Sequence, residues 1–79
     1  MTTQVRILDR EFLEEEAANM DTRRLERYII ECRNTIGGLR RMRALYGLDR
    51  DRRAALANWE LSLETAEIEL ADRDERMEY

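Results

Sequence analysis

The stretch LRRMRALYGLDRDRR, residues 39–53, decides the fold because it places a single glycine between two helical patterns. In residues 22–46 the apolar side chains recur at steps of three and four, which is the signature of one helical face. A second pattern of the same kind fills residues 50–77. Gly47 is expected to end the first helix, because glycine takes the left-handed conformation after a helix without strain.

The connection between the two patterns is so short that the helices must fold back on each other as an antiparallel hairpin. Asp21 is expected to cap the first helix, and Asp49 or Asp51 the second. The apolar phase breaks near residues 19–21, so a separate short helix is expected over 9–20. The sequence therefore predicts one all-α domain over residues 1–79, an antiparallel hairpin with a short N-terminal helix.

The helix expected over 50–77 carries two apolar lines, and one partner helix covers only one of them. The second line contains Ala54, Leu61 and Ile68, and either the N-terminal helix or a second chain packs there. Since two helices alone rarely bury enough apolar surface, we expect self-association into a helical bundle or coiled coil, with a homodimer favoured. The side chains expected to supply this interface are Leu56, Trp59, Leu61, Leu63, Ile68 and Leu70.

The net charge of −4 is unevenly distributed along the chain. A basic tip at the turn is followed by an acidic end, and both oppose the dipole of the helix over 50–77. One interpretation is that the tip binds nucleic-acid phosphates; the other is that it faces the acidic end of an antiparallel copy. The acidic total favours the second. The basic tip comprises Arg40, Arg41, Arg43, Arg50, Arg52 and Arg53, and the acidic end Asp72, Asp74 and Glu75.

Two glycines, Gly37 and Gly38, stand inside the first long helix, where each costs roughly 1 kcal/mol relative to alanine. Gly38 falls beside the predicted seam, where the missing side chain would let another backbone come close. Two interpretations of the pair are open: the loss of helix stability is simply tolerated, or the glycines have a role in packing.

The chain has no histidine and no glycine-rich phosphate loop, which removes the common nucleophilic, zinc and di-iron sites. The single cysteine, Cys32, is expected to be a small buried hydrophobic residue. We therefore expect no catalytic residue, no metal and no cofactor, and a protein that is not an enzyme.

Apolar runs are too short for a membrane span or a secretory signal, so a cytoplasmic protein without membrane contact is expected. Arginine is the only basic residue, which is typical of a GC-rich genome such as that of an actinobacterium or its phages. The predicted function is a small non-enzymatic protein-interaction module, in particular a phage or accessory-genome protein that binds and modulates a host protein. The alternatives are a nucleic-acid-associated regulator that uses the basic tip, or a structural subunit of a phage particle or other assembly.

Overall fold

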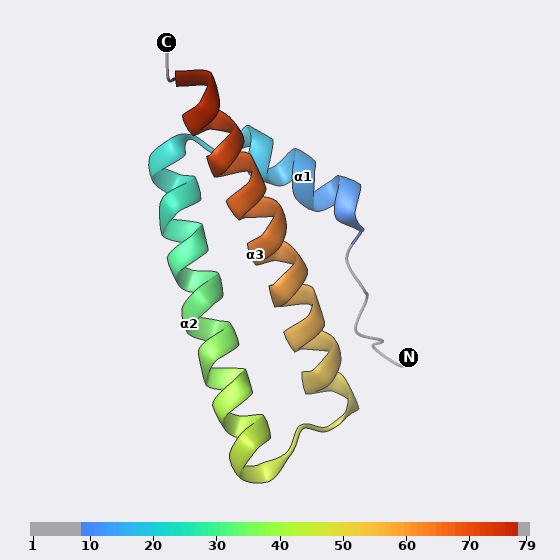
Figure 1. The fold of residues 1–79 in the computed structure, drawn as a ribbon. Helices are drawn as coiled ribbons and strands as arrows, with labels where there is room; N and C mark the ends of the chain where they lie inside the picture. Colours follow the sequence, from blue (N-terminus) through green and yellow to red (C-terminus); the bar gives the residue numbers. More distant parts are fainter. Residues whose placement is uncertain (1–8, 78–79) are drawn as a thin grey trace.

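The computed structural model describes residues 9–77, and within that range the chain is all-α (Figure 1). The helices are α1 (Arg10–Asn19), α2 (Thr22–Tyr46) and α3 (Arg50–Met77). The all-α class is thereby confirmed. The expected short helix over 9–20 is one residue longer at each end than α1. Residues 1–8 and 78–79 of the predicted domain lie outside the described residues.

Each helix begins at an aspartate, because a short carboxylate accepts the backbone N–H groups that the first turn leaves unpaired. Of the two aspartates considered for the third helix, the structure uses Asp49. The bonds run from the N–H of Glu11 to Asp9 at 3.4 Å, of Arg24 to Asp21 at 2.8 Å and of Arg52 to Asp49 at 2.9 Å.

The helix ends also follow local signals. Met20 and Asp21 are both extended, so the chain breaks between α1 and α2 where the apolar phase changes. Gly47 has a φ of +76°, which favours glycine, and its N–H donates to the carbonyl of Arg43 at 3.0 Å. This turn lets the chain reverse before Asp49.

α2 and α3 lie side by side and run in opposite directions (Figure 1). Two ion pairs join them, Arg33 with Glu67 at 2.6 Å and Arg40 with Glu60 at 2.8 Å. The partners are spaced equally on the two helices but in opposite order, as antiparallel neighbours require. Between the helices, α2 buries four apolar side chains, which are Leu25, Ile29, Cys32 and Ile36.

α1 packs against the C-terminal half of α3. Arg10, at the start of α1, pairs with Glu64 at 3.3 Å, and Ala17 joins a buried cluster with Ala66. The N-terminal helix therefore reaches the second apolar line of α3 near Ile68, which lines a groove between the two helices together with Glu14. No helix within the described part of the chain is both long and apolar enough to cross a membrane.

Candidate interaction surfaces

The basic tip is only partly available to a partner. Arg40 is engaged by Glu60 on α3, and Arg52 lies 3.9 Å from Asp49 in the same turn. The remaining tip arginines form no ion pair within residues 9–77, and these are Arg41, Arg43, Arg50 and Arg53. Two large apolar side chains stand exposed beside them, Leu45 at 66 % and Tyr46 at 85 %.

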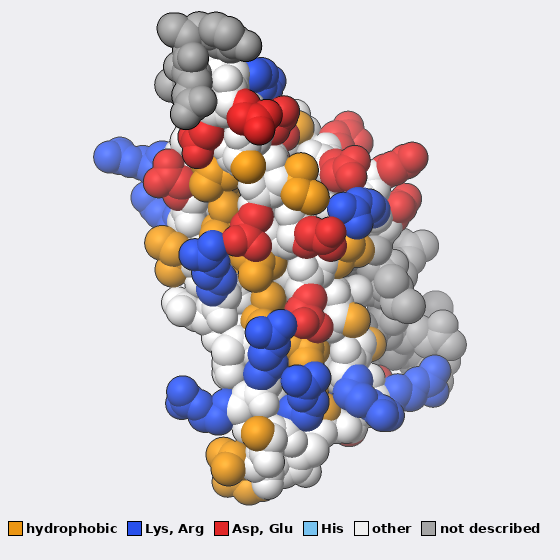
Figure 2. All heavy atoms as spheres, in the orientation of Figure 1, with side chains coloured by type: hydrophobic (Ala, Val, Ile, Leu, Met, Phe, Trp, Pro, Cys, Tyr) orange, Lys and Arg blue, Asp and Glu red, His pale blue; other side chains and the backbone are white. Residues whose placement is uncertain are grey.

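The acidic end lies at the opposite end of the molecule, which extends 48 Å along its longest axis. Asp72 pairs with Arg76 at 3.2 Å, whereas Asp74 and Glu75 form no ion pair within the described residues. Figure 2 shows acidic side chains gathered over the upper half of one face and arginines around the hairpin turn below. One chain cannot bring these two regions together, so any contact between them would need a second copy.

The structure distributes the six predicted interface residues over several environments. Leu56 is buried inside the chain with 3 % exposure, and Leu63 and Leu70 pack against the cluster formed by Ala17, Leu25, Ile29 and Ala66. Trp59 and Leu61 are half-buried. Ile68 is the exposed member of the set, at 53 %. Most of the predicted seam of α3 therefore serves contacts within one chain.

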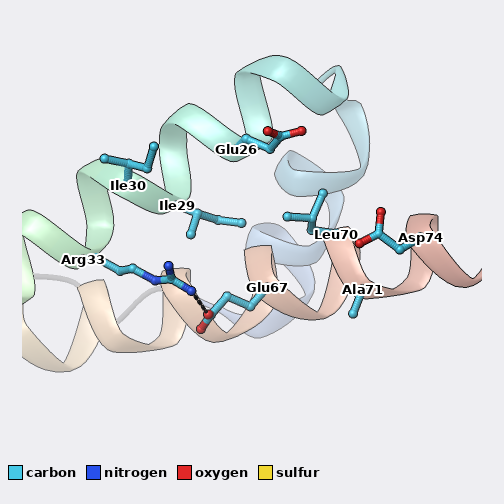
Figure 3. A pocket seen from close by; sticks show the side chains of 8 residues that line it. All are labelled: Glu26, Ile29, Ile30, Arg33, Glu67, Leu70, Ala71 and Asp74. Carbon is cyan, nitrogen blue, oxygen red and sulfur yellow. Dashed lines mark hydrogen bonds and ion pairs between the residues drawn. The ribbon is translucent and has the colours of Figure 1, made fainter.

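A shallow groove runs between α2 and α3 near the acidic end (Figure 3). Its apolar lining comes from Ile29 and Ile30 on α2 and from Leu70 and Ala71 on α3. Carboxylates border it, and only Glu67 among them is paired, with Arg33. The other two bordering carboxylates, Glu26 and Asp74, form no ion pair within residues 9–77. The groove suits an apolar side chain with a cation beside it.

Arg73 is the residue whose role the sequence did not indicate. It follows Leu70 by three residues, in step with the apolar pattern of α3, but its guanidinium turns to the C-terminus of α1, and its side chain is only 15 % exposed. Nε donates to Glu69 at 2.9 Å. Nη1 donates to Thr22 Oγ1 at 3.2 Å, and Nη2 to the carbonyls of Ala17 at 3.1 Å, Ala18 at 3.2 Å and Met20 at 2.6 Å. The carbonyls of Ala18 and Met20 at the end of α1 thereby gain a donor, and that of Ala17 gains a second one besides the N–H of Met20.

The polar side chains in the core are internally paired. Thr65 Oγ1 donates to the carbonyls of Leu61 at 3.1 Å and Ser62 at 3.0 Å. Burial raises the pKa of the Tyr28 hydroxyl, while a hydrogen bond with Ser62 works against that shift. Burial also raises the pKa of the Cys32 thiol, and a hydrogen bond with Tyr28 opposes it. Cys32 is fully buried, as predicted. A raised pKa makes this thiol a poor nucleophile.

The part of the chain that the structure describes contains no group of three or more histidine, cysteine or carboxylate side chains arranged to hold a metal ion. Comparison with protein-family models, with curated proteins and with solved structures found no match for this chain. The function must therefore be inferred from the surfaces of the molecule itself.

Proposed function

We propose that this chain is a small non-enzymatic protein-interaction module that works as a homodimer. The observation that carries the proposal is the number of large apolar side chains that the three helices leave uncovered. Within residues 9–77 these are Phe12, Ile30, Leu45, Tyr46 and Ile68. Single exposed apolar residues are ordinary on a protein surface, but here they accompany a thin core.

The core is thin because only eight apolar side chains are buried within the described residues. A domain of this size buries a smaller share of its surface than a larger one, and small helical chains often complete their core by association. A second copy would cover part of the exposed apolar surface and so add to the stability of the fold.

Charge supports an antiparallel arrangement of the two copies. The unpaired arginines at the tip of one copy would lie near unpaired carboxylates in the acidic half of the other. Exposed pairs of this kind contribute about 0–1 kcal/mol each, so they select the orientation while apolar contacts supply most of the affinity.

Sedimentation equilibrium over a wide concentration range tests the proposal. We expect a dimer that weakens in the Arg50→Glu/Arg53→Glu variant, because the reversed charges repel the acidic half of the second copy. A wild-type chain that stays monomeric up to about 1 mM, a concentration that would detect even weak association, would refute the homodimer.

The wider role that we propose is binding to a host protein, by a chain that a phage or an accessory genome encodes and that acts in the cytoplasm. The arginine-only basic content supports this part of the proposal. A structural role in a phage particle is the alternative within the same class, and it would need assemblies larger than a dimer. Affinity capture from a nuclease-treated host lysate, compared with sedimentation velocity of the pure protein, separates the two.

Nucleic-acid binding is the second candidate, and it is favoured by one feature of the tip. Tyr46 stands exposed beside the unpaired arginines, so that a base could stack where phosphates are bound. A gel-shift titration with duplex DNA and RNA at low salt tests it. Binding through the tip should weaken steeply with salt and disappear in the Arg50→Glu/Arg53→Glu variant. Binding that survives this variant would exclude the tip as the site.

A further inference from the structure

The outer face of α2 is a surface that the other helices leave uncovered. Figure 1 shows α3 and α1 on one side of α2 and no helix on the other. Leu45 stands on that free side, exposed at 66 %, and Ile30, exposed at 57 %, lies at its edge beside the groove of Figure 3. At 100° per residue, their separation of fifteen positions brings the two side chains to within about 60° of each other around the helix.

Gly37 and Gly38 lie midway between these two residues. Gly37 follows Ile30 by seven positions and Gly38 precedes Leu45 by seven, so each glycine is about two turns from an exposed apolar side chain. A Cβ built on either glycine meets no atom within 4 Å, so neither glycine is needed for packing inside the chain. Small residues at a helix crossing shorten the distance between the two axes.

We propose that α2 of a second copy crosses this face antiparallel, with the two-fold axis between Gly37 and Gly38. This inference rests on the homodimer proposed above and names its surface. In the register that sets Gly37 opposite Gly38 of the second copy, Ile30 lies opposite Leu45 of the second copy. The two-fold symmetry repeats this contact, so it occurs twice in the dimer. The arrangement is isologous, so it closes at two chains.

Charge fits the same register. Arg41 lies one turn from Glu31 of the second copy, and both residues are exposed and form no ion pair within residues 9–77. Arg27 lies level with Leu48 of the second copy and Arg41 level with Asn34, so no two arginines of α2 are placed directly opposite each other. Two Arg41–Glu31 pairs thus form at the crossing, where Arg41 lies between Ile30 and Leu45 around the helix.

In this arrangement a side chain of the second copy packs at the groove of Figure 3. Ile30 forms part of its lining, so Leu45 of the second copy packs at its edge. The basic tip of the second copy then lies beside Glu26, which borders the groove and forms no ion pair within the described residues. The apolar lining and the acidic border of the groove therefore both meet complementary groups.

Three variants with one matched control test the interface by sedimentation equilibrium. Ile30→Gln, Leu45→Gln and Gly38→Gln should each raise the dimer dissociation constant at least about tenfold, which is 1.4 kcal/mol. Ile68→Gln is the control, because Ile68 has nearly the same exposure as Ile30 but lies on α3. It should dimerise like wild type. Circular dichroism should show that Gly38→Gln keeps its helix content, because glutamine favours helices more than glycine does.

The fourth variant, Gly38→Cys, gives a positive signal. Two cysteines beside the two-fold axis should form a disulfide-linked dimer under mild oxidation, whereas Ile68→Cys should not. The native Cys32 does not interfere, since it is fully buried.

The outcomes distinguish this inference from the homodimer itself. A wild-type chain that is monomeric throughout would refute both. A wild-type dimer that persists unchanged in Ile30→Gln, Leu45→Gln and Gly38→Gln would refute only the α2 interface. Loss of the dimer in Ile68→Gln alone would move the interface to α3, where the sequence first suggested it.

Discussion

Replacing Arg73 by methionine tests whether one guanidinium holds α1 against α3. Methionine keeps an unbranched apolar stem and a high helix propensity, so the change leaves α3 itself nearly unaffected. It removes the donors that reach three carbonyls at the end of α1 and the hydroxyl of Thr22. It also removes the closer of the two cations that contact Glu69.

The expected loss in the free energy of unfolding is about 2–3 kcal/mol. Hydrogen bonds to a charged group contribute roughly 1.5–3 kcal/mol, and the value is not multiplied by the number of carbonyls because these regain water when Arg73 is removed. In a domain of this size such a loss lowers the Tm by about 10–20 °C. A helix of ten residues is unstable alone, so α1 should lose its helical structure first.

Arg76→Met is the matched control. Arg76 lies three residues further along α3 and also contacts Glu69, but its side chain is 63 % exposed against 15 % for Arg73. Because exposed ion pairs contribute little, this variant should lose no more than about 0.5 kcal/mol. Thermal denaturation followed by circular dichroism gives both values, and hydrogen exchange reports on the amides of α1. Equal losses in the two variants, or full protection of α1 in Arg73→Met, would show that the Arg73 contacts do not hold α1.

Two further predictions concern the core. Leu63→Asp should cost several kcal/mol and unfold the chain at room temperature, since Leu63 packs against the buried cluster of Ala17, Leu25, Ile29 and Ala66; a native circular dichroism spectrum with an unchanged Tm would contradict this. Stability should also fall at alkaline pH, because burial raises the pKa of Cys32 above its ordinary 9.0 and that of Tyr28 above its ordinary 10.0. The contribution of these two groups to stability is complete below pH 9.0 and is lost as the pH rises through their raised pKa values. In urea titrations the free energy of unfolding of Cys32→Ala should therefore begin to decline at a higher pH than that of the wild type. An identical onset in the two proteins would exclude the thiol as the source of the decline.

The helices could be predicted from the sequence because their limits depend on local chemistry. Asp21 and Gly47 bound α2 through contacts with residues only three or four positions away. Such local signals can be read from the sequence because they do not depend on how distant parts of the chain pack. The apolar pattern of residues 22–46 likewise predicted one buried face, and the structure buries Leu25, Ile29 and Ile36 of that pattern.

The surfaces could not be predicted in the same way, because they depend on which side chains meet across long stretches of sequence. Arg40 was assigned to the basic tip from its position, yet it pairs with Glu60, twenty residues away. Arg73 follows Leu70 at a helical step of three residues, yet its partners include main-chain carbonyls more than fifty residues away. A carbonyl has no sequence signature, so a residue that binds one looks unpartnered until the helices are placed.

The charge pattern of α3 has a different meaning once its neighbour is known. Its basic start and acidic end oppose its own dipole, which first suggested that a second copy must compensate them. In the hairpin, however, the acidic end of α3 lies beside the N-terminus of α2, as the bond from Arg73 to Thr22 shows. The positive end of the α2 dipole therefore offsets part of the cost that the α3 dipole imposes on Asp72 and Asp74, and the C-terminus of α2 does the same for Arg50. Since the dipole of α2 already offsets part of the unfavourable interaction between the charges of α3 and its own dipole, these charges alone do not require a partner. The exposed apolar side chains of residues 9–77 remain uncovered. Two of them, Ile30 and Leu45, lie on a helix face that two glycines keep open, and that face is where a second copy should first be sought.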